Sequence, residues 1–113
     1  MSDVSFHSEQ TDFSISNESQ IADWLNNVCQ KEGKTLSEIS LIFCSDDYLL
    51  EVNKQHLNHD YYTDVITFDY SEGTHVSGDI FISIDRVSDN AKIFGVSIMD
   101  EVHRIIVHGT LHL

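Results

Sequence analysis

The stretch TDVITFDYSEGTHVSGDIFIS, residues 63–83, decides the fold because it contains two strand-like segments separated by a short polar turn. Residues 63–70 and 79–83 are rich in the β-branched and aromatic side chains that favour an extended chain. Ser71-Glu72-Gly73 and Ser77-Gly78 bracket the turn between them. Connections this short join neighbouring antiparallel strands, so the stretch predicts an antiparallel pair within a sheet.

Further strand-like and helix-like segments lie on both sides of this pair. Strands are predicted at residues 4–7 and 39–44, and a polar loop from Asn53 to Asp60. Apolar side chains at helical spacing, with capping residues and terminal glycines, predict helices within residues 17–33, 45–52, 84–95 and 97–112. Strands and helices interleave without strict alternation. The predicted fold class is therefore α+β, a small mixed β-sheet of about four strands packed with about four helices.

Composition predicts one domain that spans residues 1–113, because 41% of the residues are apolar, 22% are charged and no repeat or linker is present. Cys29 and Cys44 each sit in an apolar pattern and are expected to be buried thiols, which favours a reducing compartment. Residues 1–6 lack the basic and apolar regions of a secretory signal, and no apolar run is long enough to span a membrane. A cytoplasmic protein without a membrane partner is predicted.

The charge balance limits the surfaces that could bind nucleic acid. Nineteen acidic and six basic residues give a net charge of −13, and the basic residues are scattered along the chain. A sequence-independent nucleic-acid footprint is a basic stripe, so no DNA partner is expected. A phosphate substrate would have to be attracted locally, by a bound cation and its neighbours.

The predicted C-terminal helix carries a possible metal-binding pair, His108 and His112. Four residues turn an α-helix by roughly 400°, so both imidazoles project from one face and can chelate one ion. The alternative is an ordinary pair of surface histidines. Gly109 follows the first histidine, where zinc peptidases place a glutamate base, so a base at that position is excluded. His103 lies on another face of the helix and is expected to be solvated.

Other candidates are less specific. His56 and His59 lie in the predicted loop and are either polar surface or additional metal ligands. Asp64 and Asp79 begin the two predicted neighbouring strands. They are expected to meet near one end of the sheet, where they either orient a metal-bound water or make strand-end hydrogen bonds. Arg104, one turn before His108, either contacts a phosphate or pairs with a nearby carboxylate, Glu101 or Asp100.

Taken in order, these signals resemble the YbeY family of metal-dependent endoribonucleases, which act in ribosomal RNA maturation. The resemblance covers the chain from about residue 45, and its most specific piece is the final hexapeptide. The matching stretches are Ser45-Asp46-x-x-Leu49-x-x-x-Asn53, Thr63-Asp64-Val65-Ile66-Thr67-Phe68, Gly78-Asp79-Ile80-x-Ile82-Ser83 and His108-Gly109-x-Leu111-His112-Leu113.

The resemblance implies one Zn²⁺ held by three histidines in an H-x3-H-x5-H pattern. His108 and His112 match the first two, and the third is expected beyond residue 113, so the C-terminal end of the domain is missing from this chain. The family commonly carries a functional arginine in the loop before the Thr-Asp-Val strand. That slot holds Leu57 here, which cannot bind a phosphate, and His56 or His59 is a candidate substitute.

The resemblance also implies a zinc-dependent endoribonuclease that matures the 3′ end of 16S rRNA and takes part in ribosome quality control. Its partners would be ribosomal RNA and the small ribosomal subunit. The zinc ion would lower the pKa of a bound water, supply the nucleophile and offset phosphodiester charge, while Asp64 or Asp79 shapes the groove beside it. Two rival interpretations remain, a metal-dependent hydrolase of another substrate class and a non-enzymatic ribosome assembly factor with a structural metal.

Overall fold

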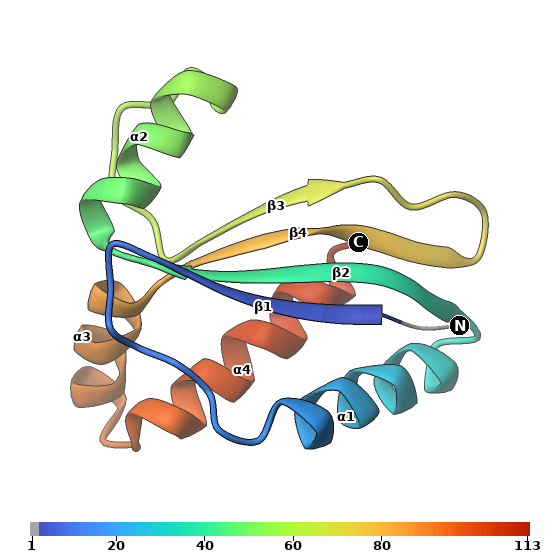
Figure 1. Cartoon of the computed structure of the whole chain (residues 1–113). Helices are drawn as coiled ribbons and strands as arrows, with labels where there is room; N and C mark the ends of the chain where they lie inside the picture. Colours follow the sequence, from blue (N-terminus) through green and yellow to red (C-terminus); the bar gives the residue numbers. More distant parts are fainter. Residues whose placement is uncertain (1–2) are drawn as a thin grey trace.

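A mixed four-stranded sheet and four helices make up residues 3–113, the part of the chain that the computed structural model describes (Figure 1). Residues 1 and 2, the start of the segment 1–6 in which no secretory signal is predicted, lie outside it. The predicted α+β class is confirmed. In chain order the elements are β1 (Asp3–Glu9), α1 (Glu18–Lys31), β2 (Thr35–Cys44), α2 (Asp46–Leu57), β3 (Val65–Asp69), β4 (His75–Ser83), α3 (Ile84–Phe94) and α4 (Ile98–Leu111).

The predicted antiparallel pair is present at one edge of the sheet. β3 pairs with β4 in a register that places Val65 opposite Ile82 and Asp69 opposite Gly78. β4 begins at His75, four residues before the predicted start at Asp79, so it is the longer strand. β4 also pairs in parallel with β2, and β2 with β1, which gives the order β1-β2-β4-β3 and leaves β3 as an edge strand.

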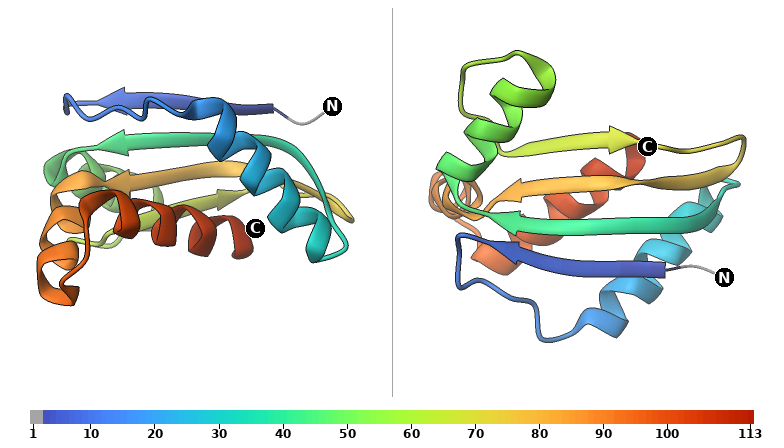
Figure 2. Two further views of the ribbon diagram at one scale, coloured as in Figure 1. Left: turned by 90° about the horizontal axis from the view of Figure 1, so that it is seen from below. Right: turned by 45° about the horizontal axis from the view of Figure 1, so that its top comes forward.

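The main core lies between the sheet and the helices α1 and α4, which cover the same face (Figure 2). Ile80 and Ile82 of β4 contribute to it, together with Ile105 and Ile106 of α4. A Cβ atom added at Gly109 would lie 2.9 Å from Cγ2 of Ile80. The glycine between the two histidines therefore allows α4 to approach the sheet closely.

Within residues 3–113, α2 is the one helix that covers the opposite face of the sheet, at one end (Figure 2). Cys44, Leu49 and Ile66 form a small core there, with Phe68 and Phe81 packed against it. Because α2 stands at the end of the strands, much of this face stays open.

Serine hydroxyls cap three helices, and the caps at Ser45 and Ser97 were predicted from the sequence. Ser45, Ser83 and Ser97 accept hydrogen bonds from the backbone N–H groups of the first turns of α2, α3 and α4. The predicted loop from Asn53 is wrong for its first five residues, because α2 continues to Leu57 and ends at Asn58 in the left-handed conformation. Among the described residues, none of the helices has both the length and the apolarity needed to cross a bilayer.

Candidate functional site

His108 and His112 lie side by side on the outer surface of α4. Their Nε2 atoms are 3.1 Å apart and their ring centroids 4.4 Å apart, and both residues are exposed. Zinc–nitrogen bonds of about 2.0–2.1 Å at a tetrahedral angle require ligand nitrogens roughly 3.3 Å apart. The two imidazoles therefore fit a shared tetrahedral ion with little movement. Glu101 and Ile105 of the same helix belong to its buried face.

The other two candidate histidines lie elsewhere. His56 packs edge-on against Phe68 at a centroid distance of 5.6 Å, and His59 stacks on Tyr61, whose hydroxyl lies 3.0 Å from Nδ1 of His59. Within residues 3–113, no three His, Cys, Asp or Glu side chains gather as a metal site would require. Neither His56 nor His59 thus joins the α4 pair, and a third histidine beyond residue 113 stays a prediction.

The two aspartates do not meet, contrary to expectation. Asp64 lies opposite Ser83, whose N–H donates to the Asp64 carbonyl at 2.9 Å, while Asp79 lies opposite Phe68. These positions are four residues apart, which is about 13 Å along a strand. The physical reason is that antiparallel strands begin at opposite ends of their ladder. Asp79 lies within the pairing, well after the start of β4.

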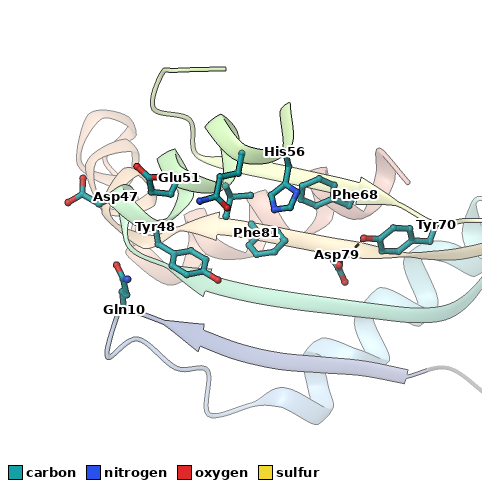
Figure 3. Close-up of a pocket in the computed structure, with 11 residues that line it drawn as sticks. Gln10, Asp47, Tyr48, Glu51, His56, Phe68, Tyr70, Asp79 and Phe81 are labelled. Atoms are coloured by element: carbon teal, nitrogen blue, oxygen red, sulfur yellow. Dashed lines mark hydrogen bonds between the residues drawn. The ribbon is translucent and has the colours of Figure 1, made fainter. Parts of the chain in front are cut away.

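Asp79 faces a cavity of about 520 Å³ on the open side of the sheet (Figure 3). Its carboxylate accepts a hydrogen bond from the hydroxyl of Tyr70 at 3.2 Å. Aromatic rings and carboxylates share the lining, among them Tyr48, Phe81 and Glu51. Since α4 covers the opposite face, Asp79 belongs to a different surface from the histidine pair.

Arg104 makes the predicted ion pair with Glu101. Its Nε and Nη2 donate to the two carboxylate oxygens at 2.8 and 2.6 Å, and its guanidinium lies 5.8 Å from the ring centroid of Phe94. The hydrogen bonds to Glu101 raise the pKa of Arg104, and the charge of Asp64 adds to the effect. Because Glu101 is only 1% exposed, we assign Arg104 chiefly to compensating a buried charge.

His103 is packed, so the expectation that it is solvated is wrong. Its ring lies edge-on to Trp24 at a centroid distance of 5.5 Å. Its Nε2 atom is buried and has no hydrogen-bond partner among residues 3–113. His103 is packed because α1 lies against α4 at this point. The spacing of residues within α4 alone could not reveal that contact.

Both cysteines are free, buried thiols within the described chain, as predicted. Burial raises the pKa of Cys44 to about 12, and the charges of Asp85 and Asp46 add to it. Burial also raises the pKa of Cys29. Buried thiols with raised pKa values are poor nucleophiles at neutral pH, so neither cysteine is a candidate catalytic nucleophile.

A groove of about 250 Å³ follows the free edge of β3, and no sequence pattern predicted it. Leu57, the slot of the missing arginine, contributes to its wall, as do His59 and Tyr61. Asn53, which is buried, donates from Nδ2 to the carbonyl of Tyr61 at 2.9 Å and so ties the loop to α2. The groove adjoins α4, since Thr67 lines it and lies next to Gly109.

Comparison with known proteins gives consistent results. The model of a protein family described as Endoribonuclease YbeY matches residues 3–113. The chain is 55% identical over 94 residues to the Endoribonuclease YbeY of Bacteroides thetaiotaomicron, covering 83% of this chain and 69% of that protein. It is 49% identical over 111 residues to the Endoribonuclease YbeY of Cytophaga hutchinsonii, covering 97% and 78%. A solution structure from Thermotoga maritima superposes with a TM-score of 0.62 at 25% identity, covering 97% of this chain and 71% of that one.

Proposed function

Because the chain belongs to the Endoribonuclease YbeY family, it is an endoribonuclease that processes ribosomal RNA, and we propose that it uses a zinc ion held in part by His108 and His112. The observation that carries the proposal is the 3.1 Å separation of the two Nε2 atoms. A third ligand from beyond residue 113 would complete the site and leave one position for water. Zinc bound there would act as a Lewis acid toward the phosphodiester and would lower the pKa of a water molecule.

The residues of the chain itself would hold and orient the reactants. Gly109 seats α4 against β3 and β4, which fixes the histidine pair relative to the β3-edge groove. The stacked rings of His59 and Tyr61 offer a flat surface on which an unpaired RNA base can stack. With Leu57 in the arginine slot, binding at this groove depends on stacking more than on a fixed positive charge.

We extend the proposal to the cellular setting. The natural substrate is ribosomal RNA near the 3′ end of the 16S molecule, presented on the small ribosomal subunit in the cytoplasm, and the activity contributes to ribosome quality control. The support for this part is the family alone. Gly109, in place of a glutamate base, argues against peptide substrates.

The decisive experiment compares His112→Ala with the wild type in the full-length natural protein. Loss of one zinc ligand should abolish zinc retention, measured by elemental analysis, and cleavage of structured ribosomal RNA together. His7→Ala is the matched control, because His7 is an exposed histidine on β1 whose ring hydrogen-bonds to the hydroxyl of Ser5.

Three results would contradict the proposal. Unchanged zinc stoichiometry in His112→Ala would refute the site. If His112→Ala loses zinc and still cleaves RNA normally, the metal has a structural role. If the wild type cleaves peptide libraries and not RNA, the substrate belongs to another class.

A further inference from the structure

Arg86, near the start of α3, joins segments that are far apart in the sequence. Its Nε and Nη2 donate to the two oxygens of Asp46 at 3.1 and 3.0 Å. Ser83 Oγ donates to the same carboxylate at 3.1 Å. Two parallel N–H···O bonds fix the plane of the guanidinium, which the rounded ammonium of a lysine cannot reproduce. The first residue of α2 is thereby tied to the junction of β4 and α3.

Tyr62 is held by the same cluster. The guanidinium of Arg86 lies over its ring at 5.1 Å from the centroid, and its hydroxyl donates to Asp47 Oδ1 at 3.2 Å. Tyr62 is 47% exposed, so burial contributes little to its position. The charge of Asp47 and the hydrogen bond to it raise the pKa of Tyr62. Stacking and one hydrogen bond therefore fix this surface ring.

Tyr62 belongs to segment 58–64, which connects α2 to β3 without helix or strand of its own. Asn53 holds the neighbouring carbonyl of Tyr61 from inside the molecule. His59, Tyr61 and Thr63 of the segment line the β3-edge groove. The segment thus has an inner attachment at Asn53 and an outer attachment at Arg86, and its inward residues form one wall of the groove.

We propose that Arg86 and Tyr62 form a latch that positions segment 58–64 along the β3-edge groove, and that Arg86 is a positioning residue for RNA binding. The inference rests on the proposed function, since it takes the ligand of the groove to be RNA. A segment that is ordered before binding loses less conformational entropy when the ligand arrives. The latch therefore strengthens RNA binding and leaves the chemical step and the zinc ligands unaffected.

Tyr62→Ala tests the latch without weakening the rest of the fold, because the ring is half exposed. We expect amide hydrogen exchange in segment 58–64 to accelerate about tenfold, the KM for RNA to rise about fivefold, and kcat to change by less than about twofold. The melting temperature and the zinc content should stay at wild-type values. Arg86→Ala should give the same split in KM and kcat with a lower melting temperature, because it also detaches α2 from α3.

Coupling between the two residues provides a second test. Once Arg86 is absent, removal of Tyr62 should raise the KM for RNA little further. The fold-increase in KM of the double variant should therefore be well below the product of the fold-increases of the two single variants. Arg86→Lys should reverse less than half of the rise in KM caused by Arg86→Ala, because lysine keeps the positive charge but lacks the planar guanidinium. Lys92→Ala is the matched control, since it removes one exposed positive charge from the same helix.

The outcomes separate the latch from the proposed function. Unchanged exchange in segment 58–64 in Tyr62→Ala overturns the latch, as does a fall in kcat or zinc content at constant KM. RNA affinity, measured by fluorescence anisotropy in EDTA, must weaken in step with KM. If the wild type binds RNA in a latch-dependent way and never cleaves it, the proposed function fails and the latch stands.

Discussion

Cys44 shows how the surroundings of one residue set its chemistry. The side chain is fully buried, and its thiol donates to the carbonyl of Ile82. Burial, assisted by nearby carboxylates, raises its pKa from 9.0 to about 12, so the native state holds the thiol proton more tightly than the unfolded state does. This contribution to stability is complete below about pH 9 and is lost as the pH rises toward 12.

We therefore predict that Cys44 resists alkylation in the native protein. At about pH 8, iodoacetamide should modify Cys44 at least 100-fold more slowly in buffer than in urea, because the thiolate is the reactive form and access is blocked. Mass spectrometry of the alkylated peptides measures both rates. Native Cys44 that reacts at the rate of a free thiol would contradict its burial and its raised pKa.

Gly109→Ala tests the close contact between α4 and the sheet. The added methyl group would lie 2.9 Å from Cγ2 of Ile80, an inflexible branch in a buried strand. Overpacking costs about 1–3 kcal/mol, whereas the better helix propensity of alanine returns at most about 1 kcal/mol. We expect a net loss in the free energy of unfolding, measured by urea denaturation. Leu111→Ala, an exposed position on the same helix, should change it little, and a stabilised Gly109→Ala would refute the contact.

At the scale of the helix, α4 carries a buried carboxylate that depends on its neighbour one turn away. Arg104→Met should leave Glu101 buried without a partner. Breaking a buried pair costs about 3–5 kcal/mol, and because Arg104 is about half exposed we expect roughly 1–3 kcal/mol. Glu101→Leu combined with Arg104→Met should restore most of the loss, since it removes the stranded charge. Thermal unfolding of the single and double variants measures these changes in stability. A double variant that is less stable than Arg104→Met would contradict the explanation by a stranded charge.

The elements that were predictable from the sequence are those specified by local signals. The caps at Ser45 and Ser97 and the short turn before β4 act within a few residues, and each was recognised. The strand ends were less certain, because pairing with β2 extends β4 back to His75. The separation of Asp64 from Asp79 was missed because the antiparallel ladder places the starts of its two strands at opposite ends.

The candidate site divides in the same way. The histidine pair was predictable because one helical turn brings both rings together. The contact between Arg86 and Tyr62 was not predictable, since Arg86 is held by Asp46, which is 40 residues away and meets it only when α2 and α3 pack. Long-range polar contacts of this kind leave no periodicity in a single sequence, which is why they were found only in three dimensions.

At the scale of the whole molecule, the two faces of the sheet have different characters. The histidine pair lies on α4, on the helix-covered side, and the β3-edge groove adjoins this helix at Gly109. The open side presents the cavity around Asp79, with carboxylates and aromatic rings. Asp47, Glu51 and Asp79 line that cavity, whereas the lining of the β3-edge groove includes none of these carboxylates, so we expect the groove to repel RNA phosphates less than the cavity does.

The overall charge leads to a last prediction, on the salt dependence of RNA binding. A protein that makes 6–10 basic contacts to phosphates loses about 10³–10⁵ in affinity between 50 and 200 mM salt. This chain has six scattered basic residues and a net charge of −13, and Arg86 and Arg104 are already paired with carboxylates. Few counterions can be released, and added salt also screens the repulsion between protein and RNA. We expect the full-length protein to lose less than about tenfold in RNA affinity over that range, measured by fluorescence anisotropy. A loss of a thousandfold would show that phosphates are gripped by a basic surface outside residues 3–113, and that the stacking groove has a minor role.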